Sequence, residues 1–264
     1  MTTVHTLASG SSGNALALSW GGGTILVDAG ISCRRIRQGL RDLGLDLGDL
    51  DAVLITHTHS DHISGLQTLL KHTACPVYAS GRAGRDLLRR LVLLEDRLRE
   101  AEGAFSVKDC AVTPFPTSHD APGSQGYRLD TPDGGFGLLT DSGVVTPEAE
   151  AVLPGVALAV LEANHDVETL RSGPYPYFLK ERILGPEGHL RNEDAAAFAV
   201  TLAAAGAREI VLAHLSRENN TPAMALRAVE TALSAAGLRP RLSAAPRESL
   251  SGAYVLEGGA VCSG

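Results

Sequence analysis

Four potential metal ligands lie within six residues, in the segment His57-Thr-His-Ser-Asp-His62. The apolar run Asp51–Thr56 precedes them and predicts a buried strand, and a helix is expected over Ile63–Lys71. In an extended segment every second side chain points the same way, so His57, His59 and Asp61 can converge. Imidazoles and a carboxylate suit Zn²⁺, Mn²⁺ or Fe²⁺. Four donors at this spacing favour a metal site over a polar, histidine-rich surface loop.

Short apolar runs alternate with amphipathic stretches along the chain. Further strands are expected over Val4–Leu7, Ala15–Ser19, Thr24–Asp28, Val77–Ala79, Phe105–Val107, Val112–Phe115, Gly126–Leu129, Phe136–Thr140, Val156–Glu162, Glu209–His214, Arg239–Leu242 and Gly252–Leu256. Further helices are expected over Ile31–Leu43, Arg82–Arg99, Asn192–Ala205 and Pro222–Ala236, with a loop over Val145–Gly155. This alternation indicates a layered α/β architecture. We find no linker long enough to divide the chain, so residues 1–264 are expected to form one domain.

Composition excludes several classes of protein. The formal net charge of −7 argues against a generic basic nucleic-acid binder, so any nucleic acid must be handled at a local site. The four cysteines, Cys33, Cys75, Cys110 and Cys262, form no CxxC pair, which favours free thiols over disulfides or a zinc-thiolate cluster. The beginning of the sequence has no signal-peptide pattern and no apolar run could span a bilayer, so a cytoplasmic protein without membrane contact is expected.

Three further donors stand at or just beyond the ends of predicted strands: His119, Asp141 and His214. Layered α/β proteins usually build sites from side chains at the carboxyl ends of strands. Taken singly, each residue could be a capping residue or a hydrogen-bonded core residue. Together with the first cluster they make five histidines and two aspartates, which matches a centre of two metal ions.

This pattern resembles the metallo-β-lactamase fold superfamily, whose signature is HxHxDH. The resemblance implies a four-layer αββα sandwich with two divalent ions, Zn²⁺ or Mn²⁺, at one edge of its two sheets. It assigns His57, His59 and His119 to one ion, and Asp61, His62 and His214 to the other, with Asp141 bridging them. It also implies that Asp28 supports the site without binding metal.

Three later segments narrow the resemblance: Leu161–Asp166, Gly188–Asp194 and Leu212–Asn220. Their order is similar to that in the tRNA 3′-processing and RNase J/β-CASP nucleases, which implies a catalytic pair of Glu162 and His189. The stretches SGSSGN, EANHD, GPYP and HLSRENN are most similar to the YycJ/WalJ-like group, although Arg191 stands where serine is usual. The interval from Asp141 to His189 is too short for a β-CASP insertion.

The resemblance implies a metal-dependent hydrolase of nucleic-acid phosphodiesters, a 5′→3′ exonuclease whose nucleophile is a hydroxide bridging two ions. Asp61 would take up a proton, and His189, held by Glu162, would protonate the leaving oxygen. DNA is favoured over RNA as the substrate. A hydrolase of small cyclic phosphodiesters, thioesters or lactones is the main alternative, and a non-enzymatic binding module is a weaker one. The oligomeric state stays open.

Candidate substrate contacts are spread over the chain. Ser11, Ser12 and Asn14 lie in a glycine-bounded turn whose amides could hold a phosphate, although an ordinary hairpin turn has the same pattern. His165 is expected either to touch phosphate or to pack in the core. Tyr175 is expected either to stack on a base or to belong to a rigid loop over the site. A groove beside the metals lined by Arg34, Arg35, Arg82, Arg85 or Arg191 would favour the nuclease over the small-molecule hydrolase.

Overall fold

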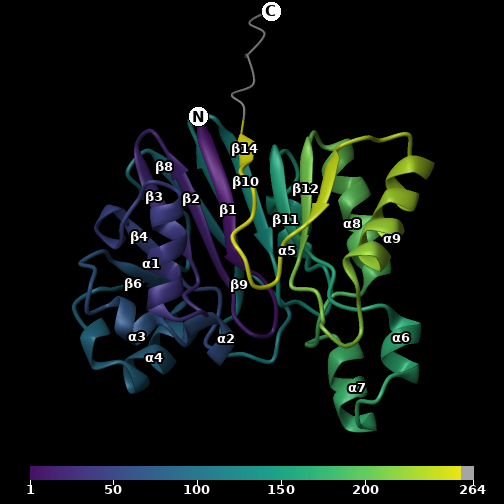
Figure 1. Ribbon diagram of the computed structural model, residues 1–264, viewed down its shortest axis with the longest axis horizontal. Coiled ribbons are helices and arrows are strands. Elements are labelled where there is room, and N and C mark those ends of the chain that lie inside the picture. Colours follow the sequence, from purple (N-terminus) through teal and green to yellow (C-terminus); the bar gives the residue numbers. More distant parts are fainter. Residues whose placement is uncertain (257–264) are drawn as a thin grey trace, which may run out of the picture.

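The computed structural model describes residues 1–256, in which two seven-stranded sheets face each other (Figure 1). The first sheet has the order β14 (Tyr254–Leu256), β1 (Thr2–Ala8), β2 (Ala15–Trp20), β3 (Gly23–Val27), β4 (Ala52–Leu54), β5 (Val77–Ala79) and β6 (Leu98–Glu100). The second has the order β13 (Arg241–Ala244), β12 (Glu209–Ala213), β11 (Leu158–Glu162), β10 (Gly134–Leu139), β9 (Gln125–Thr131), β8 (Cys110–Pro116) and β7 (Phe105–Val107).

Helices cover the outer face of each sheet. In Figure 1, α1 (Cys33–Asp42), α3 (Leu66–Leu69) and α4 (Gly81–Arg90) lie on the left, beside the first sheet. On the right, α8 (Asn192–Ala204) and α9 (Pro222–Ala235) cover the second sheet, and α5 (Pro147–Val152) also packs on it. Two further helices, α6 (Val167–Ser172) and α7 (Tyr177–Leu184), project beyond the lower edge of the sandwich. The predicted four-layer αββα sandwich is therefore confirmed.

Three apolar cores hold these four layers together. Side chains alternate across each strand, so Leu26 of β3 packs towards the first helical layer while Ile25 and Val27 pack between the sheets. Likewise, Leu161 of β11 faces the second helical layer and Val160 faces the first sheet. Strands buried on both faces explain the nearly continuous apolar runs in the sequence.

Strand direction places five loops at one edge of the sandwich. Strands β3, β4, β5 and β6 run parallel, as do β10, β11, β12 and β13. The carboxyl ends of parallel strands meet at one edge of their sheet. The loops that follow β3, β4, β10, β11 and β12 carry Asp28, the His57–His62 segment, Asp141, the segment after Glu162, and His214.

Several element predictions were wrong at their boundaries. The long helix expected over Arg82–Arg99 ends at Arg90, because Leu91 adopts an extended conformation and β6 then joins the edge of the first sheet. The expected loop Val145–Gly155 contains α5, which Thr146 caps and whose Ala149 is buried against the second sheet. Of the helix expected over Ile63–Lys71 only α3 forms, and another short helix, α2 (Ser60–Ile63), ends where the expected helix would begin.

The structure also bears on the predictions about a β-CASP insertion, the cysteines and membrane-spanning helices. Between Asp141 and His189 the chain forms α5, β11, α6 and α7, with no inserted β-CASP domain. Cys33, Cys75 and Cys110 are free and buried, whereas Cys262 lies outside the described residues. Within residues 1–256, no helix combines the length and apolar character needed to cross a bilayer.

Candidate metal centre

The structure brings all seven predicted ligands together at the loop-bearing edge. His57, His59 and His119 form one group whose ligand atoms lie within 4.8 Å of one another, and Asp61, His62 and His214 form a second. Asp141 forms a third group with His57, from the first group, and His62, from the second, and it forms a fourth with Glu162, His189 and His214. One carboxylate therefore lies between two sets of donors, as a bridging ligand must.

Four of the five histidines are held by their Nδ1 atoms. The Nδ1 partners are Thr56 Oγ1 at 3.1 Å for His57, Asp28 Oδ2 at 2.8 Å for His62, the Gly188 carbonyl at 3.0 Å for His119, and Glu162 Oε1 at 3.0 Å for His214. Such contacts fix ring orientation and leave Nε2 available for a metal. His59 differs, because its Nδ1 lies 3.2 Å from His119 Nε2.

Unsatisfied buried atoms mark the centre as a cation site. Within the described residues, His57 Nε2, His214 Nε2 and Asp141 Oδ2 are buried without a hydrogen-bond partner. Leaving such an atom unsatisfied costs about 1–3 kcal/mol, and more for a charged group. Imidazole nitrogens and carboxylate oxygens are suitable donors for Zn²⁺ or Mn²⁺. The residues present therefore fit the divalent ions that the fold family implies.

Local backbone strain accompanies the site. Asp28, Asp141 and His214 have φ values of 60°, 56° and 53°, in the left-handed region, and each follows the end of a strand closely. Such conformations cost about 1–3 kcal/mol each for non-glycine residues. At these three positions the chain leaves its strand in a left-handed conformation, and the side chains lie in or beside the cluster.

Carboxylates dominate the electrostatics of the cluster. Burial acts to lower the pKa of His62, but Asp141 and Asp28 outweigh it and raise that pKa to about 10. Burial acts to raise the pKa of Asp141, but His214 and His62 hold it well below its usual range. Divalent cations would compete with these protons for the same negative charge.

Glu162 organises the other side of the centre. It is completely buried, and its Oε1 accepts hydrogen bonds from His189 Nδ1 at 2.8 Å and His214 Nδ1 at 3.0 Å. Its Oε2 accepts from the backbone amides of Ser142 and Leu190. Burial acts to raise the pKa of Glu162, but His189 and His214 lower it to about 2, so the group is an ionised acceptor. The predicted Glu162–His189 pair is thus in direct contact.

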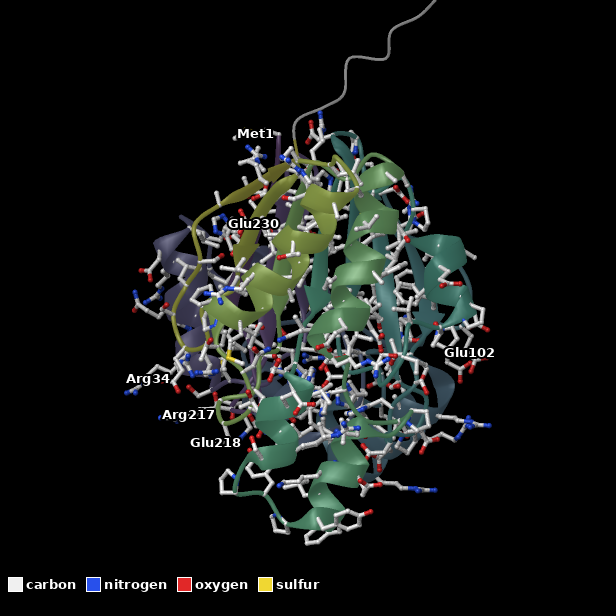
Figure 2. The ribbon with its side chains drawn as sticks, turned by 90° about the vertical axis from the view of Figure 1, so that its right-hand side faces the viewer. Met1, Arg34, Glu102, Arg217, Glu218 and Glu230 are labelled. Atoms are coloured by element: carbon white, nitrogen blue, oxygen red, sulfur yellow. The ribbon has the colours of Figure 1, made fainter. Side chains whose placement is uncertain are left out.

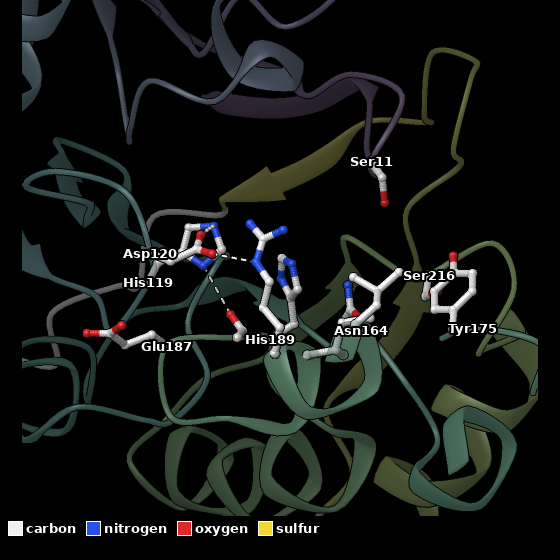
Figure 3. A pocket seen from close by; sticks show the side chains of 12 residues that line it. Ser11, His119, Asp120, Asn164, Tyr175, Glu187, His189 and Ser216 are labelled. Atoms are coloured by element: carbon white, nitrogen blue, oxygen red, sulfur yellow. Dashed lines mark hydrogen bonds and ion pairs between the residues drawn. The ribbon is translucent and has the colours of Figure 1, made fainter. Parts of the chain in front are cut away.

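A half-open cavity of about 180 Å³ lies beside the cluster (Figure 3). Its lining comprises Ser11, His119, Asp120, Asn164, Tyr175, Leu179, Arg182, Ile183, Glu187, Gly188, His189 and Ser216. Two of these residues connect the cavity to the centre: His119 is a predicted metal ligand, and His189 is the partner of Glu162. A substrate in the cavity would therefore lie against both the ligand cluster and the Glu162–His189 pair.

The predicted substrate contacts have different locations. Ser11 and Tyr175 line the cavity, whereas Ser12 is exposed and is not among its lining residues. The Nδ2 atom of Asn14 lies 3.0 Å from His62 Nε2 and 3.3 Å from Asp61 Oδ2, so this side chain lies against the ligands. His165 is buried away from the cavity lining, and neither ring nitrogen has a partner in the described residues.

The arginines that would favour a nuclease do not border the cavity. Its lining includes none of Arg34, Arg35, Arg82, Arg85 and Arg191. Arg34 points outward from the molecule in Figure 2, and Arg191 is paired with Asp194. Sequence reasoning missed Asp120 and Arg182, which do line the cavity. Asp120 could have been noticed because it follows His119 directly, but no local pattern marks Arg182.

Comparison with known proteins identifies the class. The family model described as a β-lactamase superfamily domain matches residues 23–215, and the chain belongs to this superfamily. The chain is 38% identical over 224 residues to exodeoxyribonuclease WalJ of Streptococcus pneumoniae, covering 83% of each chain. It is 36% identical over 234 residues to exodeoxyribonuclease YycJ of Bacillus anthracis, covering 88% of this chain and 89% of that one.

A solved structure agrees with this classification. The metallo-β-lactamase fold protein YhfI of Bacillus subtilis aligns with a TM-score of 0.72 over 96% of this chain and 100% of its own, at 15% identity. At that identity the likeness shows the fold alone. Family, fold and donor clusters together define a metal-dependent hydrolase, and the resemblance to the YycJ/WalJ-like group is confirmed.

Gly30 allows the close contact that supports the His57–His62 segment. Its amide donates to the Asn14 carbonyl, the Asn14 amide donates to the Asp61 carbonyl, and a Cβ on Gly30 would lie 1.6 Å from that carbonyl oxygen. We expect Gly30→Ala to lower the free energy of unfolding by about 3 kcal/mol or more, because backbone must move. Chemical denaturation would measure this.

The matched control for Gly30→Ala is Gly48→Ala, where an added Cβ meets nothing within 4 Å. The free energy of unfolding of the control should lie within about 0.5 kcal/mol of that of the wild type. Equal stabilities of the two variants would contradict the assigned contact.

Proposed function

We propose that the protein is a two-metal phosphodiesterase that degrades DNA as a 5′→3′ exonuclease, with Zn²⁺ or Mn²⁺ as the cofactor. One observation carries the proposal: Asp141 lies between the two ligand groups, with Oδ2 3.4 Å from His62 Nε2 and Oδ1 3.9 Å from His119 Nε2. The exodeoxyribonuclease relatives support a nucleic-acid substrate, and the cavity borders the ligand cluster at His119 and the Glu162–His189 pair at His189.

Each ion has its own proposed ligands. His57, His59 and His119 would hold one, Asp61, His62 and His214 the other, and Asp141 both. Bound ions would supply Lewis acidity and a hydroxide nucleophile at neutral pH, and would offset the charge of the phosphodiester. Asp28 has a supporting role, because it accepts from Thr56 through both carboxylate oxygens and contacts His62 Nδ1.

Proton movements are assigned to two side chains. Asp61 is the acceptor for the proton of the attacking water, because its carboxylate lies in the ligand cluster beside His62 and His214. His189 is the donor to the leaving oxygen. Its Nδ1 donates to the ionised Glu162, so its other nitrogen is available at the cavity wall. Glu162 orients His189 and His214 at once, which sets the donor's position relative to the second ion.

The test compares metal-loaded and chelator-treated protein on single-stranded DNA and RNA of one sequence, labelled at either end. We expect metal-dependent cleavage of DNA that releases nucleotides from the 5′ end first. His59→Ala should reduce the rate at least about 100-fold, because one ion loses a ligand. The control is His72→Ala, which changes an exposed histidine outside the cluster. Absence of metal-dependent cleavage of either polymer would refute the nuclease assignment.

A small-molecule hydrolase remains the second candidate. The absence of Arg34, Arg35, Arg82, Arg85 and Arg191 from the cavity lining favours it, as does the net charge of −7. Assays with a cyclic mononucleotide, a thioester and a lactone would distinguish the two candidates. Activity on one of these without activity on polymers would replace the nuclease by this alternative.

A further inference from the structure

Arg182 stands out among the residues around the cavity. It lies on α7 and is the one arginine or lysine among the described residues that line the cavity. Its side chain is 58% exposed, so the guanidinium is open to solvent and to a substrate. A cavity that receives an anionic substrate beside metal ligands makes a cation in its wall a candidate contact.

Asp120 holds one edge of the guanidinium. Arg182 Nε donates to Asp120 Oδ2 at 2.6 Å, while Asp120 Oδ1 lies 3.5 Å from His59 Nε2 and 3.7 Å from His119 Nε2. A single carboxylate therefore connects the arginine to two proposed metal ligands. Nη1 and Nη2 of Arg182 have no protein partner within residues 1–256, so two donor groups remain unused.

The backbone behind Arg182 is fixed relative to His189. The His189 amide donates to the Ile183 carbonyl at 3.1 Å, and a Cβ on Gly188 would lie 2.2 Å from the same oxygen. The Asp120 amide donates to the Glu187 carbonyl at 3.2 Å. These two hydrogen bonds fix Asp120 and His189 relative to the end of helix α7 and the segment that follows it. The guanidinium therefore has a defined position at the cavity.

We propose that Arg182 binds a substrate phosphate, donating from Nη1 and Nη2 to two non-bridging oxygens, and that Asp120 is a positioning residue for it. The planar guanidinium fork matches two phosphate oxygens, and hydrogen bonds between charged groups are about twice as strong as neutral ones. The inference rests on the proposed function. The phosphate is either the scissile group or a neighbouring one, such as a 5′-terminal phosphate.

The first experiment measures kinetics of metal-loaded wild type, Arg182→Ala and Arg182→Lys. Substrates are 5′-phosphorylated DNA, 5′-hydroxyl DNA of the same sequence, and bis(4-nitrophenyl) phosphate. We expect Arg182→Ala to raise KM for 5′-phosphorylated DNA about 10- to 100-fold. The slope of log KM against log salt concentration should fall by the amount that corresponds to about one phosphate contact. Arg182→Lys should recover part of the loss, because it keeps the charge without the fork.

The substrates distinguish the two phosphates. A defect limited to 5′-phosphorylated DNA assigns the terminal phosphate, whereas a defect that includes the small diester assigns the scissile one. Arg171→Ala is the matched control, because Arg171 lies on α6 beside Glu168 and does not line the cavity. Unchanged KM and salt dependence in Arg182→Ala, with active wild type, would overturn the proposal and leave the nuclease assignment intact.

Asp120→Asn separates phosphate binding from a purely structural ion pair. The amide oxygen can still accept from Arg182 Nε, but the competing negative charge is gone, so affinity for phosphate should be kept or increased. Isothermal titration of the metal-loaded proteins with inorganic phosphate measures this without catalysis. We expect weaker phosphate binding in Arg182→Ala and no loss in Asp120→Asn. Equal losses in both variants, together with lower metal content, would show a structural role only.

Discussion

Asp141→Asn is expected to reduce kcat/KM on DNA by about 1,000-fold or more. Asparagine keeps the shape of the side chain and tolerates the left-handed backbone at this position. It lacks the negative charge that lies within reach of His57, His62 and His214, and it cannot bridge two cations as a carboxylate does. The expected loss corresponds to about 4 kcal/mol of transition-state stabilisation. Steady-state kinetics at saturating metal would measure it.

Metal binding gives a second measure of the same substitution. A ligand that binds only the folded state stabilises it by about 2.7 kcal/mol at one hundred times its dissociation constant. Zn²⁺ or Mn²⁺ should therefore raise the melting temperature of the wild type, and most of this increase should disappear in Asp141→Asn. The control is Asp96→Asn, a change at an exposed carboxylate. A variant that retains two bound ions and full activity would contradict the bridging assignment.

His189→Ala is expected to reduce kcat on DNA about 100- to 10,000-fold while leaving the metal content unchanged. General acids contribute rate factors of this size when the leaving oxygen needs a proton. The loss should shrink to about tenfold or less on bis(4-nitrophenyl) phosphate, because nitrophenolate leaves without protonation. Parallel kinetics on the two substrates, with metal analysis of the purified proteins, would measure this difference.

The leaving-group comparison also tests the alternative role of His189. If His189 only supported Glu162 or contacted the substrate, the substitution would reduce kcat by the same factor on both substrates. Equal losses would therefore contradict the assignment as proton donor. A lower metal content would instead indicate that His189 acts through His214, which shares Glu162 Oε1 with it.

Much of the fold could be predicted because local patterns determined it. Apolar runs such as Leu158–Glu162 are buried on both faces, and polar side chains follow them at the edge where parallel strands end. The same pattern predicted that His57, Asp141 and His214, which are far apart in the sequence, lie in one site. The broken helix after Arg90 was missed because Leu91–Leu94 is compatible with a helix locally, whereas the free edge of β5 favours pairing with β6.

The rest of the site depends on contacts between distant loops. Asn14 contacts His62, and Arg182 contacts Asp120, through side chains separated by dozens of residues in the sequence. No spacing rule relates such pairs, because the connecting chain passes through whole layers of the sandwich. For the same reason the sequence could not show which arginine borders the cavity, because arginine-rich composition does not say which guanidinium faces it.

The proposed ligands come from both sheets, with the loop after β4 on one side and the loops after β8, β10 and β12 on the other. Ions bound as proposed would join the two halves of the sandwich at their open edge. Parting the halves would then require breaking coordination bonds, and releasing an ion would require the halves to part or the loops to yield. Global opening would thus require loss of the ions, which links the lifetime of the loaded protein to the lifetime of its bound ions.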